Sequence, residues 1–248
     1  MAGFSTVLVE FMLRLAGGIA ASLLLVPDRQ VEGRFFRNKL VIVLGLLTVA
    51  MLAQSSRIAS GASGVSPPRW ELLAAGVVAY VGGVLWMLER RGAGRTVLGL
   101  LAVATLQMAA MAYSATGRAM AWRLAEPISS GLLVGSIVIA MLLGHWYLNA
   151  PGMTLAPIRR LVLTCGGLLL ARAVVVAVGM ASFGIGAGQT PLLFWILRWS
   201  AGLLLPLVLC GMVWWTLKVP NTQSATGILY AMVVLIFIGE LVALLLDP

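Results

Sequence analysis

Residues 228–246 read ILYAMVVLIFIGELVALLL, in which Glu240 is the only charged side chain. The run is apolar on every face of a helix, so it offers no polar stripe to water. Its length is close to the roughly 20 residues that a helix needs to cross a bilayer. Residues 40–53 and 128–143 have the same apolar character. These runs predict transmembrane helices.

The whole chain has the composition of such segments. Of its 248 residues, 61% are hydrophobic and 10% are charged, and the mean hydropathy is +1.03. A water-soluble domain carries about 25% charged residues. A chain of this length also cannot enclose so many apolar helices in a soluble core. We therefore expect an integral membrane protein whose main partner is the lipid bilayer.

Spans of about 20 apolar residues divide the chain into about eight helices. Breaks such as Pro27 and the Pro67-Pro68 pair separate them. The sequence therefore predicts an all-α fold, a polytopic transmembrane helix bundle that forms a single domain over residues 1–248. The predicted helices cover about 5–26, 38–55, 70–88, 95–115, 127–149, 159–181, 191–217 and 225–246.

The basic residues of the loops predict the orientation. Ten lie in or beside the first, third, fifth and seventh loops, and four lie in the alternate loops. Because Lys and Arg are enriched in cytoplasmic loops, both termini are expected on the non-cytoplasmic side, in a bacterial inner membrane. The ten are Arg29, Arg34, Arg37, Lys39, Arg90, Arg91, Arg95, Arg159, Arg160 and Lys218; the four are Arg57, Arg69, Arg118 and Arg123.

The tryptophans agree with this orientation. Trp70 and Trp195 fall near predicted outer helix ends, and Trp86 and Trp146 fall near predicted inner ends. Indole rings prefer that interfacial depth. Loop charges and indole positions therefore predict the same topology.

The net charge of +9 does not indicate nucleic-acid binding. The basic residues cluster beside apolar runs, as juxtamembrane charges do, and not along a soluble surface with interleaved aromatics. The sequence contains no dinucleotide-binding, P-loop, serine-hydrolase or zinc-protease motif. We therefore expect no catalysis by this chain alone, and we assign it no catalytic residue and no metal ligand.

Ligated cofactors are also not expected. His145 is the only histidine, which excludes bis-histidine haem ligation within the chain. The eight acidic residues form no aspartate-rich cluster that would hold magnesium. A quinone, which needs only hydrogen bonds and an apolar site, is a candidate cofactor that requires no ligating side chain.

Ionisable groups inside the predicted helices form the main candidate site. A charge at the centre of a spanning helix costs ~2.5–3.5 kcal/mol, so such residues usually face partners or a wet cavity. With the predicted orientation, these ionisable groups and the amide of Gln107 lie near the middle of the membrane or in its outer half. The predicted buried polar cluster consists of Glu10, Arg14, Gln107, Arg172, Arg198 and Glu240.

Two interpretations of this cluster stay open. It is either a site for a quinone headgroup, a proton or an anion, or a set of ion pairs that fix the helix register. The expected pairs are Glu10 with Arg14, which are four residues apart on one helix face, and Arg198 with Glu240. Arg172 is then left over and needs an anion, carbonyl groups or a partner chain.

A second candidate region lies at the predicted cytoplasmic end of the fifth helix, at His145, Trp146, Tyr147 and Asn149. One interpretation is that His145 relays protons or ligates a haem opposite a methionine. The alternative is an interfacial belt of polar and aromatic side chains that anchors the helix end.

These features lead to three functional hypotheses. The first is a non-catalytic membrane subunit of a larger respiratory or electron-transfer complex, which holds a quinone or handles protons beside other membrane subunits. In topology alone, eight helices with short loops are similar to the quinone-binding anchors of bacterial respiratory enzymes. The second is a small secondary transporter in which arginines bind an anion and Glu240 carries the coupled proton. The third is a structural or assembly protein of the membrane.

Overall fold

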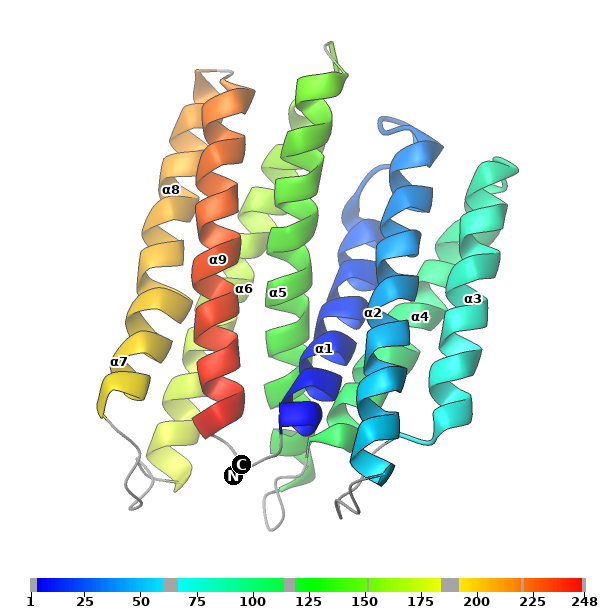
Figure 1. Cartoon of the computed structure of the whole chain (residues 1–248). Helices are drawn as coiled ribbons and strands as arrows, with labels where there is room; N and C mark the ends of the chain where they lie inside the picture. The colour runs from blue at the N-terminus through cyan, green and yellow to red at the C-terminus, as the bar shows by residue number, and fades with distance from the viewer. Residues whose placement is uncertain are drawn as a thin grey trace. The chain divides into compact units, whose positions relative to one another are not determined.

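The computed structural model describes residues 4–59, 67–113, 119–150, 152–183, 192–219 and 221–246. Over these ranges the secondary structure is helical, with no strand (Figure 1). Eight helices in the described part are long and apolar enough to cross a membrane. The prediction of an all-helical fold with about eight helices long and apolar enough to cross a membrane is confirmed for the described residues.

By their internal contacts, residues 1–135 and residues 136–248 form two compact units. The division falls inside α5 (Met120–Asn149). We describe each unit by itself. The prediction of a single domain over the whole chain stays a prediction.

Unit 1 contains four complete helices, α1 (Phe4–Leu25), α2 (Gly33–Ala59), α3 (Arg69–Met87) and α4 (Arg91–Ala112), together with the first part of α5. α1 packs against α2 and α4, and α3 packs against the same two helices. Of the spanning part of α1, 78% is buried, against 33% of that of α3. α1 is therefore the inner helix of this unit, and its polar residues are withdrawn from lipid.

Unit 2 contains the remainder of α5, α6 (Ala156–Phe183), α7 (Leu192–Trp199), η1 (Ser200–Leu204), α8 (Leu205–Lys218) and α9 (Thr222–Leu246). α8 packs against α6 and α9, and α7 and η1 pack against α9. The seventh predicted helix thus consists of two α-helical segments, α7 and α8, joined by the π-helical turn η1. Pro206 follows that turn; a proline has no N–H and clashes with the carbonyl four residues earlier, and the wider turn relieves this clash.

Glycines bring helices into close approach within each unit. A Cβ atom at Gly18 of α1 or at Gly135 of α5 would fall on the backbone of the other helix, and Gly131 of α5 faces the carbonyl of Arg14 in the same way. In unit 2, Gly202 and Gly239 face each other equally closely. Small residues allow such crossings in lipid, where packing and not the hydrophobic effect holds helices together.

The helix boundaries differ from the predicted ones mainly at the starts. α2 begins at Gly33 and not at 38, and α5 begins at Met120 and not at 127. In α5 the sequence prediction treated Pro127 as a first-turn proline, although the structure has it inside the helix. This one error changed the inventory of buried charges, as described below.

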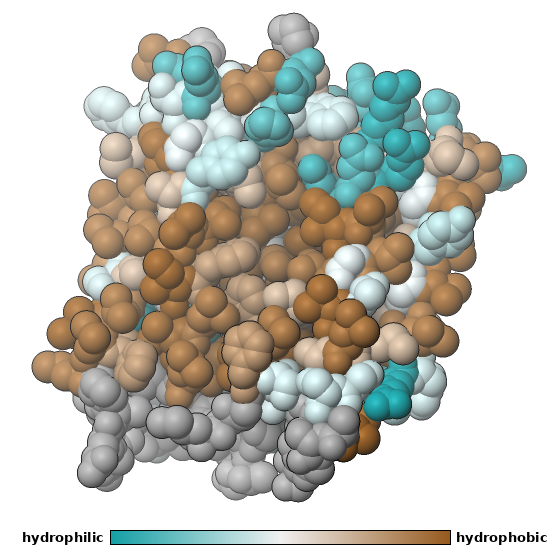
Figure 2. Space-filling view, in the orientation of Figure 1, coloured by the Kyte–Doolittle hydropathy of each residue, from teal (hydrophilic) through white to brown (hydrophobic). Residues whose placement is uncertain are grey.

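The outer surface of the helices is apolar. Figure 2 shows hydrophobic side chains over the middle of the helices and hydrophilic ones gathered toward an end. Large apolar side chains such as Leu52, Leu163 and Val234 are exposed along the helices. Exposed apolar surface of this extent indicates contact with lipid.

Candidate functional site

Arg14 holds two carboxylates in unit 1. Its Nη2 atom pairs with Oε1 of Glu10, one turn earlier on α1, and lies 2.8 Å from Oε2 of Glu126 on α5. Arg14 and Glu126 are each 1% exposed, and Glu10 is buried as well. The expected Glu10–Arg14 pair is present, and a third charged side chain completes it.

The sequence prediction missed Glu126. It began the fifth helix at Pro127, which left the glutamate in a loop. In the structure, about two further turns precede the proline, so Glu126 projects from a helix into the core. The apolar residues Trp122, Leu124 and Ala125 were the available signal that the helix extends upstream.

Aromatic and hydroxyl groups surround this cluster. The Cζ atom of Arg14 lies 5.6 Å from the centre of the Tyr113 ring, a cation–π distance. Ser130, one turn after Glu126, is buried, and so is Thr105, which donates to the carbonyl of Leu101 at 2.5 Å. The site therefore combines charged groups with polar atoms that can hydrogen-bond.

Arg172 pairs with Glu240 in unit 2. Nε of the arginine donates to Oε1 at 2.9 Å, and Nη2 donates to Oε2 at 2.8 Å. Both side chains are buried. The prediction that Arg172 is left without a carboxylate is wrong, whereas the expected pair of Arg198 with Glu240 stays a prediction. Only the packing of α6 against its neighbours determines which arginine faces α9.

Arg198 is buried in the last turn of α7. Its Cζ atom lies 5.8 Å from the ring centre of Trp195, one turn earlier. The π-helical turn η1 begins two residues further on. A cation thus stands directly before the irregular part of the seventh span.

Inclusion of Glu126 gives three buried glutamates beside three buried arginines in the described spans. The sequence prediction counted three arginines against two glutamates. The buried residues are Arg14, Arg172 and Arg198 with Glu10, Glu126 and Glu240, and Lys39 near the start of α2 is buried as well. Unit 1 contributes two of the glutamates and one of the arginines, and unit 2 contributes the opposite ratio.

Gln107 does not belong with the buried charges. It is exposed, and it lines a groove of about 410 Å³ between α3 and α4 together with Trp70 and Glu71. The prediction of Gln107 as part of a buried polar cluster is corrected accordingly. A helix position alone does not reveal which way a lone amide points when most neighbours are apolar all round.

The second predicted region is only partly buried. His145 and Asn149 are exposed, Trp146 is half-buried and Tyr147 is buried. The Tyr147 hydroxyl donates to the carbonyl of Thr154, and so ties the end of α5 to the following connection. Asn149 donates to the carbonyl of His145 at 3.5 Å. Within the described ranges, no three His, Cys, Asp or Glu side chains are grouped to hold a metal ion.

No family model matches the chain, and neither a curated protein nor a solved structure matches it. The residues and geometry above are therefore the basis for a function.

Proposed function

We propose that the chain crosses the membrane eight times, with the start of α1 and the end of α9 on the non-cytoplasmic side of a bacterial inner membrane. The ten-to-four distribution of basic loop residues supports this orientation. Contacts within each unit agree with the alternation. Arg91 donates to the carbonyl of Asp28 at 3.0 Å across the first and third loops, and Arg159 donates to the carbonyl of Leu217 at 2.8 Å near the fifth and seventh.

The function that we propose is proton handling within the bilayer, as a non-catalytic subunit of a larger membrane complex. The observation that carries it is the pairing of one guanidinium, that of Arg14, with two buried carboxylates. When one carboxyl takes up a proton, Arg14 keeps an ionised partner in the other. Either glutamate can therefore be neutral without leaving a buried arginine uncompensated, which would be the costly state.

Coupled carboxyls of this kind titrate as a unit and not as separate residues. The experiment is infrared difference spectroscopy of the reconstituted chain between low and high pH, which detects the C=O band of a protonated carboxyl. We expect the band in the wild type and in the control Glu71→Gln, since Glu71 is only half-buried, on α3, whereas Glu10 and Glu126 are buried. Glu10→Gln and Glu126→Gln should each shift or abolish it. An unchanged band in both variants would refute the proposal.

The subunit part of the proposal has its own test. Purification from native membranes in a mild detergent should yield the chain together with other membrane proteins, and quinone extraction from that preparation tests the quinone alternative. A lone monomer would contradict membership of a complex. A preparation free of quinone would remove the quinone and leave the proton site.

A second candidate function is secondary transport of an anionic substrate. The observation that favours it is the π-helical turn Ser200–Leu204 directly after the buried Arg198. Irregular turns within spanning helices mark binding sites in many transporters. Uptake of anions by proteoliposomes that is lost in Arg198→Gln but kept in Arg160→Gln would support transport. Absence of flux across a broad anion panel would exclude it.

A further inference from the structure

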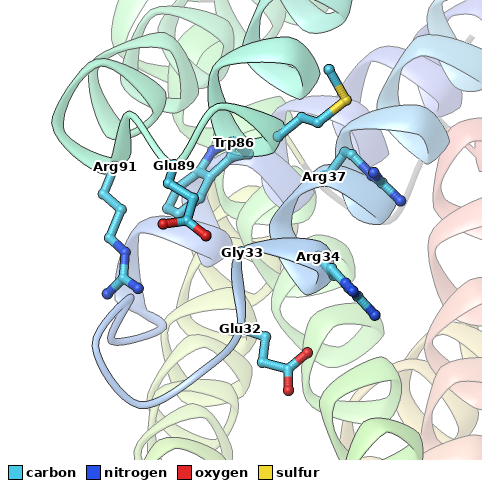
Figure 3. A pocket seen from close by; sticks show the side chains of 8 residues that line it. Glu32, Gly33, Arg34, Arg37, Trp86, Glu89 and Arg91 are labelled. Carbon is cyan, nitrogen blue, oxygen red and sulfur yellow. The ribbon is translucent and has the colours of Figure 1, made fainter.

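Three helix ends in unit 1 enclose a charged cavity. It has a volume of about 590 Å³ and lies where α2 begins, α3 ends and α4 begins (Figure 3). That volume is within the range of small-ligand sites, about 300–1,000 Å³. Its charged lining consists of Arg34, Arg37 and Arg91 with Glu32 and Glu89.

The wall of the cavity is held in place by packing. Trp86 is 2% exposed and stacks on Phe36, with ring centres 4.1 Å apart and an interplanar angle of 6°. A Cβ atom at Gly94 would lie 2.7 Å from Nε1 of Trp86, so the indole lies directly on α4. Arg91 is oriented by its hydrogen bond to the carbonyl of Asp28. The indole and one guanidinium are thus preorganised.

Acidic and basic side chains that line the cavity form no ion pairs with other residues in the described part of the chain. Arg34 and Arg37 extend side by side from α2, and Glu89 projects from the connection opposite (Figure 3). None of these three side chains, nor Glu32, forms an ion pair within 4.0 Å with another described residue. A ligand that carries an anion and a cation together would satisfy both sets.

An apolar groove lies farther along the same pair of helices. It has a volume of about 330 Å³ and runs between α2 and α3, with Leu44 and Tyr80 in its lining. The two features lie on one side of the helix pair. A Cβ atom at Gly83 would lie 3.9 Å from Cγ of Arg37, and one at Gly76 would lie 3.6 Å from Cδ1 of Leu44. Arg37 and Leu44 are two turns apart, which is about 10 Å along a helix.

We propose that this face of unit 1 binds one phospholipid whose headgroup carries both a phosphate and an ammonium group. Guanidinium groups are preferred partners of phosphate, and Arg34 and Arg37 supply two from the same side of the cavity. Glu32 and Glu89 accept the ammonium and disfavour a purely anionic headgroup. One acyl chain lies in the groove between Leu44 and Tyr80, as the order of polar and apolar parts in a phospholipid requires.

Native mass spectrometry of the full-length chain in detergent tests the headgroup, with phosphatidylethanolamine and phosphatidylglycerol added at equal concentrations. The wild type should retain phosphatidylethanolamine in preference. Arg34→Gln with Arg37→Gln should weaken that binding about tenfold or more, since a hydrogen bond to a charged group contributes about that factor. The matched control, Arg29→Gln with Arg160→Gln, removes the same charge from exposed positions outside the cavity and should bind as the wild type does.

Glu32→Gln with Glu89→Gln should shift the preference toward phosphatidylglycerol. Equal loss in the arginine variant and its control, or a wild type that prefers phosphatidylglycerol, would overturn the headgroup assignment.

The acyl groove has a separate test. Gly76→Leu places a side chain in the groove against Leu44 and should weaken lipid retention, whereas Gly45→Leu on α2 should not, because a Cβ atom there meets nothing within 4 Å. Free phosphoethanolamine should compete only weakly with the lipid. If it binds as tightly as the lipid, the cavity is a site for soluble phosphate compounds and the groove assignment is wrong.

Discussion

Arg172 on α6 and Glu240 on α9 meet along two parallel hydrogen bonds, of 2.9 and 2.8 Å, although 68 positions separate them in the chain. This two-pronged geometry is the most specific that an arginine and a carboxylate can form. Both partners are buried. The pair therefore fixes the rotation of α6 relative to α9, and each partner depends on the other to offset its own desolvation.

Loss of one partner should cost more than loss of both. Arg172→Met leaves Glu240 buried without its bidentate partner, and we expect the free energy of unfolding to fall by about 3–5 kcal/mol. The double variant Arg172→Met with Glu240→Met should recover much of that loss, because two apolar side chains need no compensation. Reversible unfolding in mixed micelles measures all the variants as a double-mutant cycle.

The control for this cycle is Arg160→Gln, which removes an exposed charge from the same helix and should leave stability within about 0.5 kcal/mol. Additive effects of Arg172→Met and Glu240→Met would show that the two side chains do not act as a pair.

Where α1 and α5 cross, the two glycines in contact, Gly18 and Gly135, should not tolerate substitution by a residue with a side chain. Gly18→Ala or Gly135→Ala directs a methyl group onto the opposite backbone, and overpacking of this kind costs about 1–3 kcal/mol. Gly45→Ala on α2 adds the same methyl group where nothing lies within 4 Å. Thermal unfolding in detergent should separate the variants. If all three change the melting temperature equally, the close crossing does not control the effect.

The packing of the Trp86 indole against α4 should require a glycine at position 94. At Gly94 a Cβ atom would lie 2.7 Å from Nε1 of Trp86, whereas at Gly92, half a turn earlier in α4, it would meet nothing. We expect Gly94→Ala to destabilise the chain by about 1–3 kcal/mol. Gly92→Ala should be neutral or stabilising by up to about 1 kcal/mol, since alanine favours a helix. Melting temperatures that fall equally would contradict the contact.

Two adjacent arginines should behave differently. Arg159 donates to the carbonyl of Leu217 at 2.8 Å, near the end of α8, and Arg160 is exposed. A hydrogen bond to a charged group contributes about 1.5–3 kcal/mol, so Arg159→Gln should lower stability and increase hydrogen exchange at the end of α8. Arg160→Gln should change neither. Identical exchange in the two variants would mean that this bond does not hold the helix end.

The composition and the apolar runs were sufficient to predict the solvent, the helical class and the number of spans. The Glu10–Arg14 pair was also predictable, because residues four apart on a helix are neighbours whatever surrounds them. Glu126 was missed for a local reason: a proline is compatible with both the first turn and the interior of a membrane helix. The residues before Pro127 are apolar enough to allow either.

What the sequence determined by itself was the need for lipid and the contacts within single helices, since both follow from side-chain polarity and the helical repeat. Only the tertiary structure decided that Glu240 pairs with Arg172, that Glu126 reaches Arg14, and that Gln107 points outward. Those choices depend on which helices are adjacent and how each is rotated. In a helix that is apolar on every face, no polar stripe predicts which side faces the protein. Close packing at small residues determines the rotation of the helix instead.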